Sequence, residues 1–174
     1  MSSRKENNKI QKMCFGALFA AMICLCTFIS IPLPFGYFNL GDAAILLSAW
    51  IMGPLVGCIS AAVGSALADI LMGYVIYAPA TAIIKALIAI SAYFIYKALS
   101  KVITAPKLSF ISRAVAASFG ELIMVAGYFL YEAFVLGYGM AALASVAGNL
   151  LQGICAVIIS TLVFGILKKA INKL

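Results

Sequence analysis

Apolar residues occur in long runs along this chain, separated by short segments rich in glycine, proline or charged residues. A helix needs about 20 mostly apolar residues to cross the hydrocarbon core of a bilayer. The pattern therefore predicts membrane helices at residues 13–31, 43–53, 55–73, 75–99, 111–136 and 140–167. The second run is short. Gly53-Pro54 after it predicts a tight turn, because proline disfavours helix in the preceding residue, so runs two and three should form a close hairpin.

Composition supports a membrane protein rather than a soluble one. Hydrophobic residues make up 66% of the 174 residues and charged residues 10%, whereas soluble domains carry about 45–50% apolar and about 25% charged residues. We expect an all-α membrane protein, a bundle of six transmembrane helices forming a single domain over residues 1–174. The first run follows basic residues, as in a signal peptide. Its length of roughly 19 residues exceeds the usual core of about 7–15, so we interpret it as the first membrane helix.

Basic residues predict the orientation of this bundle. In a six-helix topology, eleven of the twelve fall on one side, and the opposite loops at 32–41, 73–77 and 137–139 have none. The eleven are Arg4, Lys5, Lys9, Lys12, Lys97, Lys101, Lys107, Arg113, Lys168, Lys169 and Lys173. The positive-inside rule then predicts that both termini are cytoplasmic. This placement explains the net charge of +7 without nucleic acid as a partner.

The opposite, outer loops are rich in aromatic residues. These are Phe35, Tyr37, Phe38, Tyr74, Tyr77 and Tyr138. They fit an interfacial aromatic belt, and they equally fit an outward-facing pocket that stacks on a flat ligand. Both interpretations can hold for different members of the set.

Ionisable side chains in membrane spans are costly and usually functional. Asp42, Asp69, Lys85, Glu121 and Glu132 lie in or near the predicted spans. In the predicted orientation most of them lie in the outer half of the membrane, and Glu121 lies deeper, near the middle. We expect Asp42 to open the second helix at the outer surface, where Asp42 or Asn39 can cap the helix N-terminus.

Helical spacing places further polar residues beside these groups. Glu121, Tyr128 and Glu132 share one face within about 20° at 3.6 residues per turn. Thr81 and Lys85 are neighbours at i, i+4. On the last helix, the stripe at the same kind of spacing consists of Ser145, Asn149 and Gln152.

Two interpretations of these groups remain open. In the first, they pair as interhelical contacts, with Lys85 bound to Glu121, because an unpaired buried lysine is expensive. In the second, they line a water-filled pocket, because Asp69, Glu121 and Glu132 are three acids for one buried lysine. The surplus of acceptors favours a ligand that carries amino, ring N–H or hydroxyl donors.

Known catalytic and metal-binding motifs are absent from the sequence. The five cysteines lie in apolar runs without a CxxC pair, and the chain has no histidine, so we expect neither a metal nor a cofactor. No phosphate-binding loop, HExxH or GxSxG motif occurs. The chain is therefore predicted not to be an enzyme, and to depend on a partner for energy.

Four short motifs resemble those of energy-coupling-factor (ECF) transporter S components. They are Asn39-Leu-Gly-Asp42, Gly53-Pro54-x-x-Gly57, Gly64-Ser-Ala-x-Ala68-Asp69, and Gly73-Tyr-x-x-Tyr77-Ala-Pro79-Ala-Thr81 followed by Lys85. The chain is most similar to the group that includes hydroxymethylpyrimidine and pyridoxine carriers, together with riboflavin-type S components. The likeness covers essentially the whole chain.

This resemblance implies a substrate-capturing, multi-pass subunit of an ABC-type importer in the bacterial inner membrane. It implies that the first helix docks on a transmembrane coupling protein through an AxxxA motif, here Ala17 and Ala21, and that two ATPase subunits supply the energy. It also implies that the subunit topples in the membrane during transport.

The predicted ligand is a small heteroaromatic vitamin or precursor of the hydroxymethylpyrimidine or pyridoxine type. The alternatives are a riboflavin-specific S component, or a small membrane enzyme or assembly factor without a transported ligand. The predicted substrate-binding residues are Asn39, Asp69, Tyr74, Tyr77, Thr81, Lys85, Glu121, Tyr128, Glu132, Asn149 and Gln152. We expect the loop at 32–41 to cover this site.

Overall fold

A computed structural model describes residues 2–33, 36–105 and 108–171 of the chain. Phe35, Lys107 and Lys173, which were assigned to loops above, lie outside the described residues. The elements in chain order are α1 (Ser2–Phe28), β1 (Ile31–Leu33), β2 (Gly36–Phe38), α2 (Gly41–Met52), α3 (Pro54–Leu71), α4 (Ala78–Val102), α5 (Ser109–Leu130), the π-helix η2 (Tyr131–Val135), the 3₁₀-helix η3 (Gly139–Ala142) and α6 (Leu143–Ile171).

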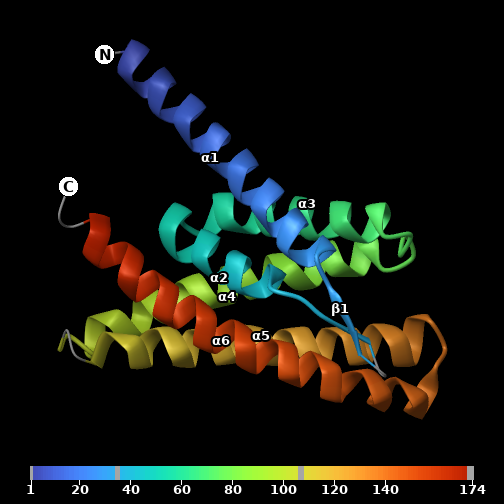
Figure 1. Cartoon of the computed structure of the whole chain (residues 1–174). Helices are drawn as coiled ribbons and strands as arrows, with labels where there is room; N and C mark the ends of the chain where they lie inside the picture. Colours follow the sequence, from blue (N-terminus) through green and yellow to red (C-terminus); the bar gives the residue numbers. More distant parts are fainter. Residues whose placement is uncertain (1, 34–35, 106–107, 172–174) are drawn as a thin grey trace.

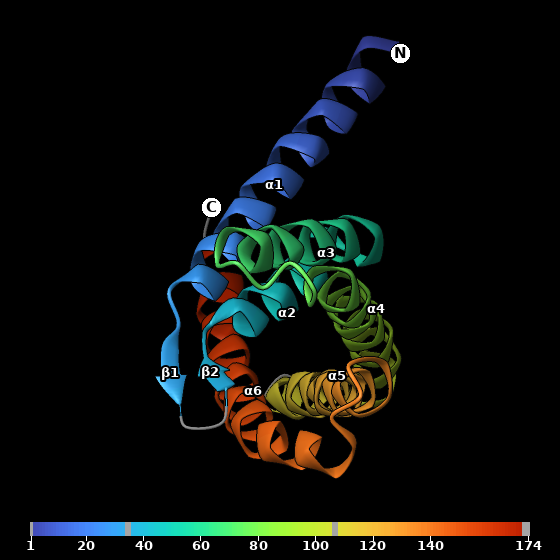
Figure 2. The same ribbon diagram turned by 90° about the vertical axis from the view of Figure 1, so that its right-hand side faces the viewer.

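The helices run back and forth along one bundle (Figure 1). The two chain ends and the α4–α5 connection lie toward one end of the bundle, which we call the terminus end. The β1–β2 hairpin and the α3–α4 and α5–α6 connections lie toward the other end, which we call the cavity end. α1 leans away from the bundle, so that its first half projects beyond the other helices (Figures 1 and 2).

Five of the helices are long and apolar enough to cross a membrane. They are at 9–28, 54–71, 78–102, 109–135 and 139–167. The expectation of an all-α, multi-pass membrane protein is confirmed by these helices, although the segment predicted as an outer loop at 32–41 contains a short antiparallel hairpin in which Ile31 pairs with Phe38.

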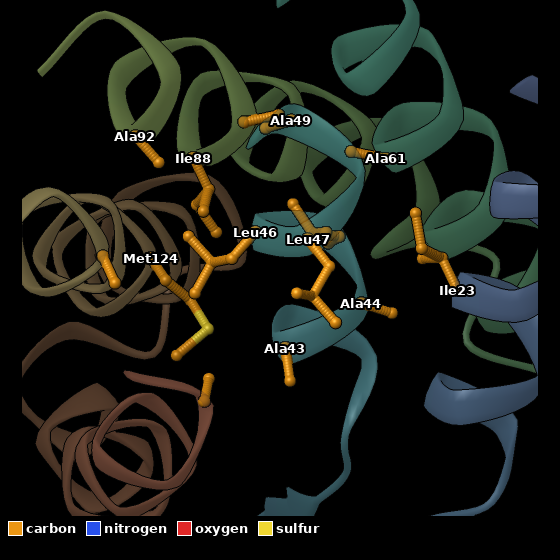
Figure 3. Close-up of a cluster of buried hydrophobic side chains, with 14 of the residues drawn as sticks. Ile23, Ala43, Ala44, Leu46, Leu47, Ala49, Ala61, Ile88, Ala92 and Met124 are labelled. Atoms are coloured by element: carbon orange, nitrogen blue, oxygen red, sulfur yellow. The ribbon is translucent and has the colours of Figure 1, made fainter. Parts of the chain in front are cut away.

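α2 differs from the other helices, because it is short and enclosed. Its 12 residues extend roughly 18 Å at 1.5 Å per residue, well below the about 30 Å of a bilayer core. Every residue from Gly41 to Trp50 is buried. α2 contacts α1, α3, α4 and α6, and its Leu46 points toward Ile88 and Met124 on the surrounding helices (Figure 3).

The turn between α2 and α3 forms where Gly53-Pro54 predicts it. Gly53 has a φ of +87°, a conformation that glycine adopts without steric cost, and Pro54 is the first residue of α3. Gly57 then faces the backbone of Ala49, and a Cβ at Gly57 would lie 2.7 Å from the Ala49 Cα atom. The two helices therefore approach closely because residue 57 has no side chain.

Candidate functional site

A cavity of about 260 Å³ lies at the cavity end of the bundle, among residues from five helices, η2, the segment before α2 and the α3–α4 connection. Its walls combine aromatic, hydroxyl, amide and ionisable side chains. The lining residues are Thr27, Asn39, Asp69, Met72, Tyr74, Tyr77, Thr81, Lys85, Tyr128, Glu132, Ser145, Asn149 and Gln152.

An ion pair lies beside this cavity, and Lys85, one of its two members, lines the cavity. The Lys85 Nζ atom donates a hydrogen bond to Asp42 Oδ1 at 2.6 Å, and the two side chains are 5% and 0% exposed. Gln152 Nε2 donates to the second Asp42 oxygen. Lys85 Nζ also lies 3.2 Å from the sulfur of Met124. The buried charge on Asp42 is therefore balanced by Lys85 and by an amide from α6.

Of the interpretations left open above, the pair of Lys85 with Glu121 is not found. Lys85 pairs with Asp42, because α2 runs through the interior of the bundle and brings its first turn to α4. Asp42 lies in that first turn and is fully buried among the helices. Leu40 occupies the N-cap position of α2 and makes no side-chain capping bond, so the expected cap by Asp42 or Asn39 is not the one found. Asn39 instead accepts a hydrogen bond from the Gly41 N–H at 2.9 Å.

The segment before α2 is attached to α6. The Asn39 N–H donates to Gln152 Oε1 at 3.2 Å, so Gln152 joins the start of α2 to the last helix with both ends of its amide. β2 also packs against α6. These contacts hold β2 beside α6 (Figure 2), and Asn39 and Gln152 both line the cavity.

Tyr128 and Thr81 form the wall between α4 and α5. Their hydroxyl oxygens lie 3.0 Å apart and share a hydrogen bond. The ammonium of Lys85 lies 5.4 Å from the centre of the Tyr128 ring, which is a cation–π distance. The spacing of Thr81 and Lys85 at i, i+4 thus brings both side chains to the same wall.

Glu132 lies in the π-helix η2, at the point where α5 stops being α-helical. It accepts hydrogen bonds from Tyr77 Oη at 3.4 Å and from Ser145 Oγ at 2.5 Å. Burial and the neighbouring Glu132 raise the pKa of Tyr77 above its ordinary value, so the phenol keeps its proton and remains a donor. Short π-helical segments within α-helices are frequent at functional sites.

Asp69 lines the cavity with a carboxyl group whose hydrogen-bonding capacity is only partly used. It is buried, and its Oδ2 atom has no hydrogen-bond partner among the described residues. Thr81 and Lys85 are the neighbouring groups that act on this carboxyl group. A ligand that brings an N–H or O–H donor to this carboxyl group would supply the missing partner.

Ten of the eleven predicted site residues lie on this cavity, and Glu121 does not. Glu121 faces a separate groove between α5 and α6, although it shares a helical face with Tyr128.

Three lining residues were not predicted as site residues. Two of them could have been found from helical spacing. Thr27 continues the face of Gly16, Ala20 and Ile23, and Ser145 belongs to the stripe of Asn149 and Gln152. Nothing in the sequence around Met72 indicated a place in the cavity.

The outer-loop aromatic residues divide between the two environments considered for them. Tyr74 and Tyr77 line the cavity, and their rings meet edge to face at a centroid distance of 6.4 Å. Tyr138 is instead 54% exposed, as expected of an interfacial residue.

Comparison with known proteins agrees with this architecture. The profile of the family described as "ECF-type riboflavin transporter, S component" matches residues 7–170. The chain belongs to this S component family. A curated relative from Pyrococcus woesei, described as "Uncharacterized protein in gap 3'region", is 33% identical over 146 residues, covering 84% of this chain and 92% of the relative.

Membership of this family makes the chain a substrate-binding subunit of a vitamin transporter, and the family is one of transporter subunits and not of enzymes. S components work together with an ECF module. In this S component, Ala17 and Ala21 are exposed on α1. The neighbouring face of α1 is occupied within the chain, because Ser60 Oγ donates to the Gly16 carbonyl at 2.8 Å.

Proposed function

We propose that this S component captures a small, single-ring heteroaromatic vitamin or precursor, of the hydroxymethylpyrimidine or pyridoxine type, at the outer face of a bacterial cell membrane. The observation that carries the proposal is the cavity lined by tyrosines, Lys85 and the open acceptor Asp69. A flat ring can stack on the tyrosines. Its amino or hydroxyl substituents can donate to Asp69 and Glu132.

The size of the cavity supports a small ligand. Its volume of about 260 Å³ lies just below the roughly 300–1,000 Å³ of pockets for drug-sized molecules. A pyrimidine or pyridine with short substituents suits this space. A three-ring ligand with a polyol chain would require the hairpin segment or the α5–α6 connection to move outward.

Riboflavin is the alternative ligand, and the description of the matching family favours it. Its ring system could use the same tyrosines, and its polyol hydroxyls could donate to Asp69 and Glu132. The two ligands differ in what they demand of the structure. Riboflavin needs a wider cavity than the one described, whereas the single-ring ligands do not.

Transport would follow from association with a coupling protein and two ATPase subunits, as in other ABC-type importers of this class. The exposed pair Ala17 and Ala21 supports α1 as the docking helix, because small residues allow close helix–helix approach in membranes.

We also propose six membrane crossings with both termini in the cytoplasm, with α2 passing through the interior of the bundle. The placement of eleven basic residues supports this orientation.

A binding panel tests the ligand. The purified chain is titrated calorimetrically with pyridoxine, hydroxymethylpyrimidine, thiamine and riboflavin, and native mass spectrometry identifies any vitamin that co-purifies from rich medium. We expect sub-micromolar binding of a single-ring compound. Tight binding of riboflavin alone would contradict the substrate class and leave the capture function standing, whereas no sub-micromolar ligand in the panel would contradict the capture function itself.

A further inference from the structure

A groove separate from the cavity lies between α5 and α6. Its volume is about 350 Å³, and its lining is almost entirely apolar. The lining residues are Ser118, Glu121, Leu122, Val125, Leu150, Gly153, Ile154, Val157 and Ile158. Leu122 and Ile154 are 60% and 57% exposed, and both helices are of membrane-spanning length. The groove therefore opens onto the surface that lipid chains cover.

Glu121 lines this groove near the middle of the α5 span. The residue is 5% exposed, and neither of its carboxyl oxygens has a hydrogen-bond partner among the described residues. Gly153 on α6 makes room for it, because a Cβ at position 153 would lie 3.0 Å from the Glu121 Cβ and 3.4 Å from its Oε2 atom. α6 thus provides space for this carboxyl group but no donor.

The charged groups around Glu121 do not compensate a carboxylate at this position. Asp42 on α2 and Lys85 on α4 act on it electrostatically, but they are bound to each other at 2.6 Å, so the Lys85 charge is already balanced. The other residues that line the groove, on α5 and on α6, carry no charge. An ionised, unpaired carboxylate in such surroundings is expensive, and groups in this situation take up a proton instead.

We propose that Glu121 is a proton-binding site facing the lipid phase through the α5–α6 groove, distinct from the substrate cavity. The bound proton makes the side chain a neutral carboxyl group in the middle of the membrane. The site does not depend on which vitamin the cavity takes, because its carboxyl group lies outside the cavity lining. It is predicted to be a target for reagents that dissolve in lipid and react with protonated carboxyl groups.

Dicyclohexylcarbodiimide is the appropriate probe. The Glu121 O–H adds across one C=N bond of the reagent, so that the carboxyl oxygen bonds to the central carbon and the proton goes to a nitrogen. The acyl group then migrates from oxygen to nitrogen, which breaks the bond between the Glu121 acyl carbon and that oxygen and forms a C–N bond, while the oxygen stays on the central carbon as the urea carbonyl. The product is a stable N-acylurea that contains every atom of both reactants.

The experiment uses the full chain in liposomes, labelled with dicyclohexylcarbodiimide or with a water-soluble carbodiimide, followed by peptide mapping. We expect one dicyclohexylcarbodiimide adduct on Glu121, retained in Glu132→Gln and lost in Glu121→Gln, with no adduct on Glu121 from the water-soluble reagent. Mapping of the unaltered chain decides the matter even if a variant does not fold. The proposal is overturned if Glu121 stays unmodified or if the water-soluble reagent labels it.

Discussion

At the scale of single residues, the pair of Lys85 and Asp42 holds a cavity-lining lysine in place. Both side chains are removed from solvent and are held at 2.6 Å. Breaking such a pair by removing one partner usually costs more than removing both, because the remaining charge stays buried without compensation. The cost of a change at either residue should therefore depend on what stands at the other.

A double-mutant cycle tests this dependence. We expect Lys85→Met to destabilise the chain by about 3–5 kcal/mol, and Lys85→Met combined with Asp42→Asn to cost clearly less than the sum of the two single changes. Chemical unfolding in detergent measures these free energies. Lys101→Met, an exposed position at the terminus end, is the control and should change stability little. Additive losses at residues 42 and 85 would contradict the pairing.

Asp69 should determine ligand affinity rather than stability. Because one carboxyl oxygen lacks a partner among the described residues, Asp69→Asn should leave the fold intact and remove a charge-assisted hydrogen bond to the ligand. The expected loss is about 1.5–3 kcal/mol, roughly a 10- to 100-fold rise in Kd. Calorimetric titration with the vitamin found by the panel measures it.

The control for Asp69 is Ser91→Ala. The Ser91 hydroxyl bonds to the Ile88 carbonyl of its own helix, and Ser91 does not line the cavity. Its loss should leave Kd unchanged. An unaltered Kd in Asp69→Asn would show that this carboxyl group does not contact the ligand.

Single residues also show what sequence reasoning could reach. Asp69, Lys85 and Glu132 were predictable cavity residues, because ionisable groups within apolar runs are rare and expensive. The partner of Lys85 was not predictable. Asp42 is separated from Lys85 by 43 positions, and helical spacing within one span says nothing about which neighbouring helix faces it. The prediction that Glu121 lines the cavity was wrong for a related reason, since a shared helical face does not ensure a shared depth in the bundle.

At the scale of elements, α2 is the helix on which the others pack. A surface helix is apolar on one stripe, whereas a helix that is apolar all round is buried, and α2 is of the second kind. Its shortness was visible in the sequence, but its enclosure by four other helices was not. The π-helix at the end of α5 was equally hidden, because the same apolar pattern suits α- and π-helical turns.

The close approach of α2 and α3 gives a test at this scale. Gly57→Ala should destabilise the chain by about 1–3 kcal/mol, because a methyl group would press on the Ala49 backbone and force the helices apart. Thermal unfolding in detergent, followed by helical circular dichroism, measures the effect.

Gly165→Ala on α6 is the matched control for Gly57→Ala. A Cβ at residue 165 would meet its nearest neighbour, the Arg113 side chain, at 3.7 Å, which is an ordinary contact. Alanine is favoured over glycine within helices, so this variant should be neutral or slightly more stable. Equal effects at residues 57 and 165 would contradict the role of Gly57 in the hairpin.

At the scale of the whole molecule, the chain ends lie toward one end of the bundle and the α3–α4 connection toward the other (Figure 1), and Tyr74 and Tyr77 of that connection line the cavity. In the orientation proposed from the positive-inside rule, the basic residues lie in the cytoplasm and the cavity end faces outward. A fluorescent protein fused after residue 174 should therefore fluoresce in cells, and alkaline phosphatase fused at the same point should be inactive, because it requires export. Alkaline phosphatase inserted in the α5–α6 connection should be active. The reverse pattern would contradict the proposed orientation.

The surface of α1 has one face that packs on the bundle and one that is exposed. On the packed face, the Ala20 carbonyl and Ile23 contact Gly64 of α3. Ala17 and Ala21 lie on the exposed side, one turn apart, and the first half of the helix stands away from the other helices (Figure 2). A partner helix could approach this side closely without disturbing the cavity.

Leucine substitution separates docking from ligand capture. Ala17→Leu and Ala21→Leu should each reduce co-purification with the coupling protein and its ATPases, because the larger side chain keeps the partner helix at a distance, while Kd for the vitamin stays unchanged. Ala147→Leu, at an exposed alanine of α6, is the matched control and should retain the complex. Loss of vitamin binding together with the complex would mean that α1 shapes the cavity, and an intact complex in both variants would mean that the coupling protein docks elsewhere.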